Sequence, residues 1–265
     1  AGRLVGALGV SEPDAGSDVP AIRTRAVRDG ADYVINGSKL YISNGTIADY
    51  ITLAVRTGGP GAKGLSVIVV PADSHGLRRR RLRKLGTHAS DTAELFFEDC
   101  RVPAANLLGA ENAGFGMIMS GFEGERLVLS VMACGHARLM FDEAREWGHQ
   151  RRAFGQPVLG FQVWQHRLAD VLTRIEAAEA LALRGIDLYV RGRPAQSEIS
   201  MAKLFATETA RFAASECAQI YGGLGYMEES LMARLHRDAL AMTVGAGSSE
   251  VMRSLIARAN NLVAP

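Results

Sequence analysis

The sequence predicts an α+β protein, with an antiparallel, barrel-like β-domain followed by a C-terminal four-helix bundle. From Arg3 to about Pro103 it consists of short runs rich in Val, Ile, Tyr, Thr and Leu, separated by Gly, Asn and Asp, which is typical of strands and turns. After Pro103 apolar residues recur three and four positions apart, which is typical of amphipathic helices. A chain of 265 residues with 48% hydrophobic content can bury two cores. We therefore expect two domains, residues 1–106 and 107–265.

Six runs in the first half have the length and composition of strands. They cover residues 22–27, 32–35, 39–42, 50–55, 65–70 and 93–97. Tight reversals are expected at residues 28–30 and 36–37, because Gly and Asn tolerate the positive φ that hairpin turns require. The first half is therefore predicted to be a sheet of antiparallel hairpins.

Long helices are expected near residues 113–150, 161–191, 195–221 and 248–262, with a shorter one around 228–240. The spacing of Leu168, Val171 and Ile175 is one example of the helical period. A Gly-Arg-Pro sequence at 192–194 interrupts the pattern between two of these helices. Four long amphipathic helices with short connections indicate a bundle.

Composition limits the function classes. A net charge of +2 gives no general reason to expect nucleic acid as a partner. The basic run at 78–84 is typical of a solvated face, although it could also bind the phosphates of an anionic ligand. No apolar run is long enough to cross a bilayer and no secretory leader opens the chain, which favours a cytoplasmic location, or the mitochondrial matrix in a eukaryote. Cys100, Cys134 and Cys217 lack a paired spacing and are expected to be buried free thiols.

Three motifs occur in an order that is specific in combination. They are LGVSEPDAGSD at 8–18, RRAFG at 151–155 and QIYGGLGY at 219–226. In this order they resemble the acyl-CoA dehydrogenase family of flavoenzymes, and the resemblance covers nearly the whole chain. Family members normally carry a helical domain before the part matched by residue 1 onward. We therefore expect either a fragment of a longer protein or a chain without that first domain.

The resemblance implies FAD as cofactor. Removal of a hydride from an acyl thioester needs an acceptor that no side chain provides, and the sequence has no GxGxxG after an early strand, which argues against a nicotinamide site. In the family FAD lies between the β-domain and the C-terminal helices. The matching positions are Leu8, Val10, Ser11, Tyr41, Ile42, Ser43, Arg151, Phe154, Gln162, Gln219, Gly222, Gly223, Ser248 and Glu250.

Several of these positions have a simpler interpretation. Tyr41, where the family often has tryptophan, could be a core strand residue. Arg151, which in the family reaches the pyrophosphate of a neighbouring subunit's FAD, could be a charge that complements a helix C-terminus. Glu250 is expected in the first turn of the last helix, where capping is favoured over catalysis. Leu224 replaces a residue that is commonly polar in the family, so only backbone contacts are expected there.

The catalytic base is the most informative position. The family usually reads YEGTSE near the C-terminus, and alignment with GAGSSE at 245–250 places Ala246 where the glutamate stands. An alanine side chain cannot accept a proton, but its backbone N–H could still hold the thioester carbonyl. The stretch GFEGERLVL at 121–129 resembles the isovaleryl-CoA and long-chain members, whose base matches Glu125 and whose vacated site has a Gly-Ala-Gly-type sequence.

We therefore predict that Glu125 is the base, the alternative being an ordinary surface carboxylate. The predicted substrate contacts are Ser17, Glu123, Arg126 and Ala246. A carboxylate buried beside an apolar acyl chain would have a raised proton affinity, which suits proton abstraction near neutral pH.

The resemblance implies an enzyme that converts an acyl-CoA to its trans-2-enoyl-CoA in fatty acid or branched-chain catabolism. It also implies an electron-transfer flavoprotein as acceptor and a homo-oligomer, either a dimer or a homotetramer. Two alternatives stay open, namely an acyl-CoA oxidase and a non-catalytic flavin-binding or scaffold subunit of a hetero-oligomeric dehydrogenase. No metal site, nucleic-acid partner or membrane insertion is predicted, and the acyl chain length cannot be read from the sequence.

Overall fold

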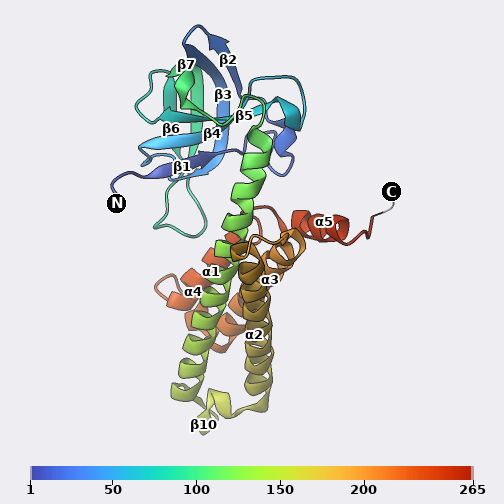
Figure 1. The fold of residues 1–265 in the computed structure, drawn as a ribbon. Coiled ribbons are helices and arrows are strands. Elements are labelled where there is room, and N and C mark those ends of the chain that lie inside the picture. The colour runs from blue at the N-terminus through green and yellow to red at the C-terminus, as the bar shows by residue number, and fades with distance from the viewer. Residues whose placement is uncertain (1, 264–265) are drawn as a thin grey trace. The chain divides into compact units, whose positions relative to one another are not determined.

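A computed structural model describes residues 2–263 and divides them into two compact units, one ending at Gly121 and the next beginning at Phe122 (Figure 1). The first unit is built on a sheet and the second on helices. The α+β class predicted from the sequence is therefore confirmed. The predicted boundary after residue 106 stays a prediction.

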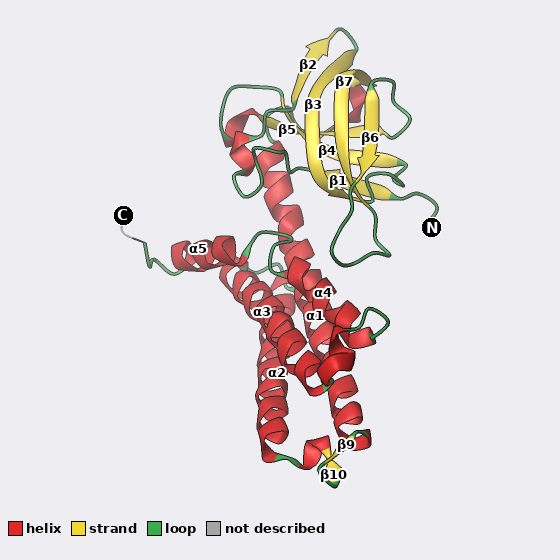
Figure 2. Cartoon of the chain, turned by 180° about the vertical axis from the view of Figure 1, so that it is seen from behind, coloured by secondary structure: helices red, strands yellow, loops and turns green. Residues whose placement is uncertain are grey.

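One eight-stranded sheet forms the first unit, and Figure 2 shows β3, β7 and β6 side by side in it. The order along the sheet is β6-β7-β3-β2-β4-β5-β8, and β1 pairs with β4 outside that path. The strands are β1 (Gly6–Gly9), β2 (Arg25–Asp29), β3 (Asp32–Ser43), β4 (Tyr50–Arg56), β5 (Leu65–Pro71), β6 (Leu77–Arg81), β7 (Thr92–Pro103) and β8 (Leu107–Leu108).

The barrel predicted from the sequence was wrong, whereas most strand pairs of the sheet are antiparallel, as predicted. The path ends at β6 and β8, which do not pair, so the sheet is open. In addition, β1 runs parallel to β4, and β2 meets β4 in parallel register at Arg25 and Arg56. Closure and strand direction depend on which distant strands meet, and composition carries no such information.

The hairpin at residues 28–30 is confirmed, since Asp29 of β2 pairs with Asp32 of β3. The turn expected at 36–37 was wrong, because β3 continues through it. There the β3–β7 register shifts between Ile35 and Gly37, as in a β-bulge. Gly37 has φ 144°, and a Cβ at this position would lie 2.7 Å from Thr24 Cα. This glycine therefore serves a close approach of two backbones inside the sheet.

The second unit and the segment leading into it contain five α-helices in the described residues. They are α1 (Gly114–Gln150), α2 (Gln162–Val190), α3 (Gln196–Ile220), α4 (Leu231–Met242) and α5 (Ser249–Ala259). Each lies within a few residues of its predicted position. A short hairpin of β9 (Arg152–Ala153) and β10 (Gln156–Pro157) joins α1 to α2. The arrangement of four of these helices as a bundle stays a prediction.

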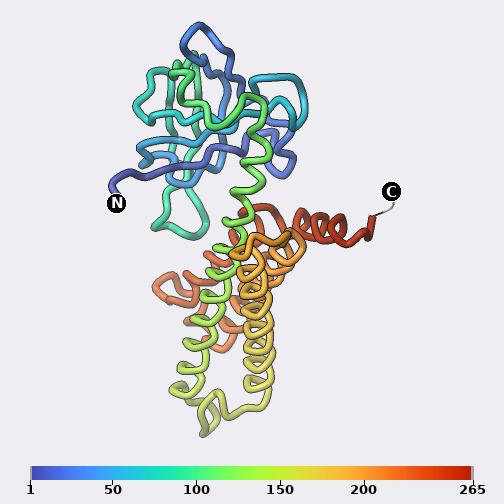
Figure 3. Tube along the Cα trace, in the orientation of Figure 1, coloured from blue at the N-terminus to red at the C-terminus, as the bar shows by residue number. Residues whose placement is uncertain are grey.

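Small residues build the core of the second unit. The buried face of α3 carries Ala206, Ala210, Ala213 and Cys217, all of which are almost fully inaccessible. Side chains of this size let helices approach closely, and α3 packs against α2, α4 and α5. Figure 3 shows α2 and α3 following one another side by side along the trace. The three cysteines are free and buried, as predicted.

Candidate active site

Glu125 lies on α1, in the helical turn that contacts the loop carrying Ala246. Arg126, the next residue, is only 6% exposed, and its Nε donates a hydrogen bond of 3.0 Å to the Ala246 carbonyl oxygen. The two residues are 120 positions apart in the chain. The structure thus brings together the position where the family's base is missing and the helical turn that carries the predicted replacement.

The carboxyl group of Glu125 has a shifted proton affinity. Its side chain is solvent-accessible, but the protein atoms packed around it remove enough water to raise its pKa, and the charge of Arg126 opposes this only in part. Burial likewise lowers the pKa of Arg126, while Glu123 and Glu125 act in the opposite direction. The guanidinium also lies over the Phe122 ring, 5.8 Å from its centroid. The direction of this shift suits the role of a base that the sequence predicts for Glu125.

The loop opposite Glu125 connects α4 to α5. Ala246 has φ 53°, a left-handed conformation that is uncommon for residues other than glycine. Its amide donates no hydrogen bond within the described residues, whereas the neighbouring Gly245 and Ser249 amides bond to Ala241 and Thr243. The Ala246 N–H is thus available to an acceptor that the chain itself does not supply.

Ser248 and Glu250 begin α5. Ser248 is the N-cap, with its hydroxyl 3.4 Å from the Val251 amide, and Glu250 stands in the first turn. Hydrogen bonds at this helix start lower the pKa of Glu250. This geometry agrees with the capping interpretation of Glu250. The predicted contacts of both residues with FAD stay predictions.

In the first unit, the segment after β1 lies against the middle of β3. The Leu40 amide bonds to the Ser11 carbonyl at 2.8 Å, and Lys39 Nζ bonds to the Val10 carbonyl at 2.9 Å. These contacts bring the predicted flavin contacts at 8–11 next to those at 41–43. Ser17 follows in an exposed position on the same loop.

Two of these residues leave apolar surface exposed in this unit. Tyr41 is 70% exposed with φ 63°, in a stretch where the β3–β7 register shifts between Lys39 and Ile42. Leu8 on β1 is 44% exposed, while Val10 and Ile42 are buried. The irregular strand thus turns the Tyr41 ring outwards, which contradicts the alternative of a core residue. An aromatic ring and an aliphatic side chain with free faces suit contact with a planar ring such as isoalloxazine.

The remaining predicted flavin contacts gather at the far end of α1 in the second unit. Trp147 near the end of α1 stacks on Tyr221 after α3, with ring centroids 5.0 Å apart, and so joins the segment of Arg151 to that of Gln219, Gly222 and Gly223. Phe154 is 96% exposed, and a Cβ placed on Gly222 or Gly223 would meet no atom within 4 Å. Gln162 opens α2 and is exposed. The guanidinium of Arg151 makes no hydrogen bond or ion pair with the described residues, so its donors are available to an anion.

This cluster and Glu125 occupy opposite ends of α1. Glu125 and Arg151 are separated by 26 positions of the chain, nearly all of them helical, which corresponds to about 39 Å at 1.5 Å per residue. The predicted base and the predicted pyrophosphate contact of one chain therefore lie far apart along this helix.

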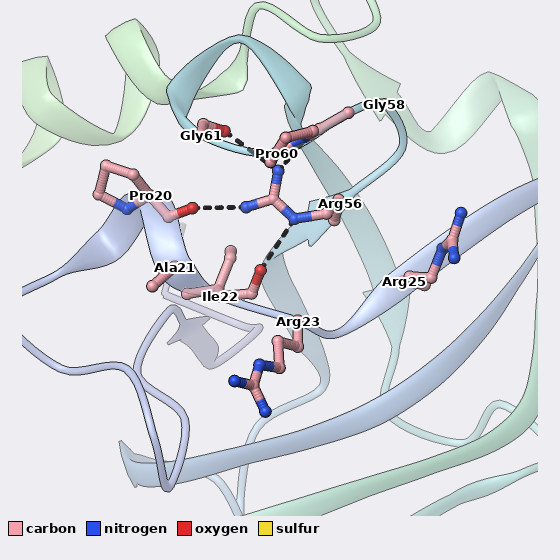
Figure 4. Close-up of a pocket in the computed structure, with 10 residues that line it drawn as sticks. Pro20, Ala21, Ile22, Arg23, Arg25, Arg56, Gly58, Pro60 and Gly61 are labelled. Atoms are coloured by element: carbon pink, nitrogen blue, oxygen red, sulfur yellow. Dashed lines mark hydrogen bonds between the residues drawn. The ribbon is translucent and has the colours of Figure 1, made fainter.

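Cavities elsewhere in the first unit do not include the predicted site. The cavity in Figure 4, of about 570 Å³, is lined by residues near Pro20 and Gly61. The guanidinium of Arg56 also lines it and donates hydrogen bonds to the carbonyls of Pro20, Ile22, Gly59 and Gly61. A second cavity, of about 700 Å³, is lined by residues 81–84, His88 and Ser90.

The basic run forms ion pairs on the surface. Arg78 and Arg80 pair with Glu98 and Glu94, as expected of a solvated face.

Comparison with known proteins decides the family. The acyl-CoA dehydrogenase middle domain matches residues 7–100, and the acyl-CoA dehydrogenase C-terminal domain matches residues 112–260. Cyclohexane-1-carbonyl-CoA dehydrogenase of Geobacter metallireducens is 41% identical over 97% of this chain, and the mitochondrial long-chain specific acyl-CoA dehydrogenase of Sus scrofa is 40% identical over 97%. The chain belongs to the acyl-CoA dehydrogenase family.

Solved structures of acyl-CoA dehydrogenases agree with this. A probable acyl-CoA dehydrogenase from Mycobacterium abscessus superimposes with a TM-score of 0.96 at 44% identity, covering 98% of this chain and 69% of that one. Butyryl-CoA dehydrogenase from Megasphaera elsdenii gives 0.95 at 34% identity, covering 97% and 68%. The chain spans 68% of the Geobacter relative and 61% of the Sus scrofa relative.

Sequence reasoning missed two buried lysines of this acyl-CoA dehydrogenase family member. Lys39 is fully buried and pairs with Glu12 at 2.8 Å beneath the predicted flavin loop. Lys203 is fully buried on α3 and bonds to the loop that carries Ala246. A signal for Lys203 was present, because it lies four positions after Ile199 on the face that carries the buried alanines.

The part of the chain that the structure describes holds no helix both long and apolar enough to span a bilayer.

Proposed function

We propose that this chain carries the catalytic residues of an FAD-dependent acyl-CoA dehydrogenase that converts an acyl-CoA thioester to its trans-2-enoyl product, with Glu125 as the base. The observation that supports this best is the bond from Arg126 to the Ala246 carbonyl, which joins the turn of Glu125 to the loop where the family's glutamate is absent. The enoyl product requires loss of a proton from Cα and a hydride from Cβ. Glu125 takes the proton.

The surroundings of Glu125 suit this role. Burial raises the pKa of its carboxyl, so the carboxylate gains affinity for a proton, and the charge of Arg126 opposes this rise only in part. The rate of proton removal should therefore rise with pH through a pKa above the ordinary carboxyl value and level off beyond it. Glu123 and Arg126 bind the CoA part of the substrate in this proposal.

The Ala246 N–H donates to the thioester oxygen. Charge builds up on this oxygen as the α-proton leaves, and a fixed amide donor stabilises that charge more in the transition state than in the ground state. The vacant amide of Ala246 supports the assignment. Its small side chain leaves room beside the thioester, which is compatible with a branched acyl group.

FAD, when bound, supplies the hydride acceptor. The exposed Tyr41 ring and Leu8 side chain, with Val10, Ser11, Ile42 and Ser43, are proposed to hold its ring, and Ser17 to lie near both cofactor and substrate. The unpaired Arg151 guanidinium is proposed to bind the pyrophosphate, with the exposed Phe154 and Gln162 and the glycine segment from Gln219 around it. A solved FAD-dependent dehydrogenase with a TM-score of 0.96 and 28% identity supports this cofactor.

The separation of Arg151 from Glu125 favours a homo-oligomer. If each FAD needs both groups, Arg151 has to come from a neighbouring copy of the chain. The acceptor is proposed to be an electron-transfer flavoprotein. This choice of acceptor rests on the resemblance to the acyl-CoA dehydrogenase family.

Anaerobic titration with a series of acyl-CoAs tests the function. Loss of the oxidised flavin absorbance is expected with a suitable substrate, because hydride transfer reduces the flavin, and slow reoxidation in air is expected of a dehydrogenase. Rapid reoxidation would instead identify an acyl-CoA oxidase. Absence of any change would support a non-catalytic subunit. The kcat/KM ranking across the series defines the chain length and branching that the site accepts.

A further inference from the structure

Two buried cations hold the loop that carries Ala246. Lys203 Nζ donates to the Gly247 carbonyl at 2.6 Å and lies 3.4 Å from the Thr243 carbonyl, while Arg126 Nε donates to the Ala246 carbonyl. Three of the five carbonyls of residues 243–247 thus face a positive charge. The Ala246 amide is left without an acceptor in the described residues.

Lys203 is an unusual residue to find in this position. Its side chain is fully inaccessible, and it makes no ion pair with a carboxylate within the described residues. Burial of an ammonium without a paired carboxylate is costly, and a methionine of similar length would fill the space without that cost. A requirement for carbonyl-binding donors explains a lysine here, whereas packing alone does not.

The charged groups around Lys203 come from three helices. Arg126 on α1 repels its charge, and Glu208 on α3 and Glu250 on α5 attract it from a distance. Thr243 directly follows α4, so the ammonium also lies at the negative end of that helix dipole. The ammonium is therefore held mainly by the carbonyls of the loop and not by a carboxylate.

We propose that Lys203 is a positioning residue, which fixes the 243–247 loop so that the Ala246 amide stays free and stationary for the thioester oxygen. The inference rests on the proposed function of that amide. Ala246 is held at φ 53°, and the bonds from Arg126 to its own carbonyl and from Lys203 to the Gly247 carbonyl stabilise this conformation. Lys203 itself touches neither the substrate nor the reacting atoms.

The arrangement has a pH dependence of known sign. Burial in the first place, and Arg126 in the second, lower the pKa of Lys203 to about 8. Above that pH the neutral amine forms weaker hydrogen bonds to the loop carbonyls, so the loop is held less firmly. The fold responds in the opposite direction, because the unfolded chain binds this proton up to pH 10.5 and the native state gains stability as pH rises between the two values.

Replacement of Lys203 by Met in the FAD-loaded full chain tests the inference. The infrared stretch of a ¹³C-labelled thioester carbonyl, measured in a Glu125→Gln background, reports the hydrogen bond from Ala246 without turnover. Lys203→Met should move this stretch towards the unbound value. In the chain that retains Glu125 it should lower kcat at least about tenfold with KM within about threefold, as expected when a transition-state donor is misplaced. Lys63→Met, at an exposed position in a short 3-10 helix (Ala62–Gly64) of the first unit, is the control.

Rescue separates positioning from folding. Lys203→Arg should keep the carbonyl shift and extend it above pH 8, since a guanidinium stays charged. If Lys203→Met does not fold, the chain with native Lys203 provides the same test. Its thioester carbonyl stretch should move towards the unbound value as pH rises above 8. An unchanged stretch and an unchanged kcat in Lys203→Met would overturn the inference.

A flavin-free measurement keeps this test distinct from that of the proposed function. The Ser249 amide bonds to the Thr243 carbonyl at 3.0 Å, so its hydrogen exchange reports whether the loop is held. Faster exchange in Lys203→Met is expected even if no acyl-CoA reduces the flavin. That result with no flavin reduction would refute the proposed function alone, and unchanged exchange with normal flavin reduction would refute the role of Lys203 alone.

Discussion

At the scale of single residues, the two buried lysines support the two loops that the proposed chemistry uses. Lys39 bonds to the Val10 carbonyl in the segment of predicted flavin contacts, as Lys203 bonds to the loop that carries Ala246. Unlike Lys203, Lys39 also pairs with a carboxylate, that of Glu12. Glu12 accepts bonds from Lys39 and from the amides of Arg23 and Thr24. Burial by itself raises the pKa of Glu12, but these partners outweigh it and the net shift is downward.

Glu12→Gln should destabilise the first unit and loosen the flavin loop. Loss of one partner leaves the other charge buried, which costs roughly 3–5 kcal/mol. Because the pKa of Glu12 is lowered by folding, its contribution is complete above 4.5 and disappears as pH falls through the folded value. Urea unfolding from pH 7 down to pH 3 measures this. A variant that loses no stability at pH 7 would show that the pair does not support the loop.

The sequence could predict only part of the candidate site at this scale. The absence of a glutamate at Ala246 and the predicted replacement by Glu125 could be inferred because both positions stand in recognisable motifs. The role of Lys203 was not predicted, because its helical spacing indicates at most a buried face. The carbonyls that its ammonium contacts are brought to it only by the packing of α3 against α4 and α5.

At the scale of elements, periodicity predicted the helices well and the strands unevenly. Helices of more than ten residues repeat their apolar pattern often enough to define their ends. The edge strand β6 was missed, because it consists mainly of exposed arginines and has no apolar alternation. The parallel strand β1 was missed for a different reason, since its four residues carry too little pattern. The turn expected at 36–37 was wrong because Gly37 is needed for a close backbone approach and not for a turn.

Gly37→Ala tests that interpretation. A Cβ at this position would clash with the Thr24 backbone and strain a φ of 144°, which together should cost about 3 kcal/mol. Gly30→Ala is the matched control, because Gly30 has φ 60° but no atom within 4 Å of an added Cβ. It should lose only about 1 kcal/mol from backbone strain. Equal losses in the two variants, measured by thermal unfolding, would exclude a packing role for Gly37.

At the scale of the whole molecule, the length of α1 bears on the proposed assembly. Glu125 and the Arg151 cluster of one chain lie far apart along α1, which is why we propose that each complete site takes one group from each of two copies. The sequence predicted this sharing only through its resemblance to a family. The helix length gives an independent physical reason.

Mixed oligomers test the sharing of sites. Glu125→Gln and Arg151→Gln chains should each be inactive alone. In a mixed oligomer, one site combines both lesions and another combines Glu125 of one chain with Arg151 of the other, so activity should return. Refolding the two variants together, with flavin reduction as readout, measures this. If the mixture stays as inactive as its components, both groups act within one chain and the proposed assembly is wrong.

We infer that the base of this acyl-CoA dehydrogenase family member stands on α1 and not on the loop before α5. Anaerobic single-turnover reduction of the flavin by its best acyl-CoA tests this most directly, in the unmodified chain, in Glu125→Gln, in the control Glu123→Gln, and in Glu125→Gln combined with Ala246→Glu. We predict that Glu125→Gln binds FAD but abolishes reduction. Glu123→Gln should retain reduction at saturating acyl-CoA, because it alters only the binding of the CoA part, and the added glutamate should restore part of the rate. Reduction at the unmodified rate in Glu125→Gln would contradict the account.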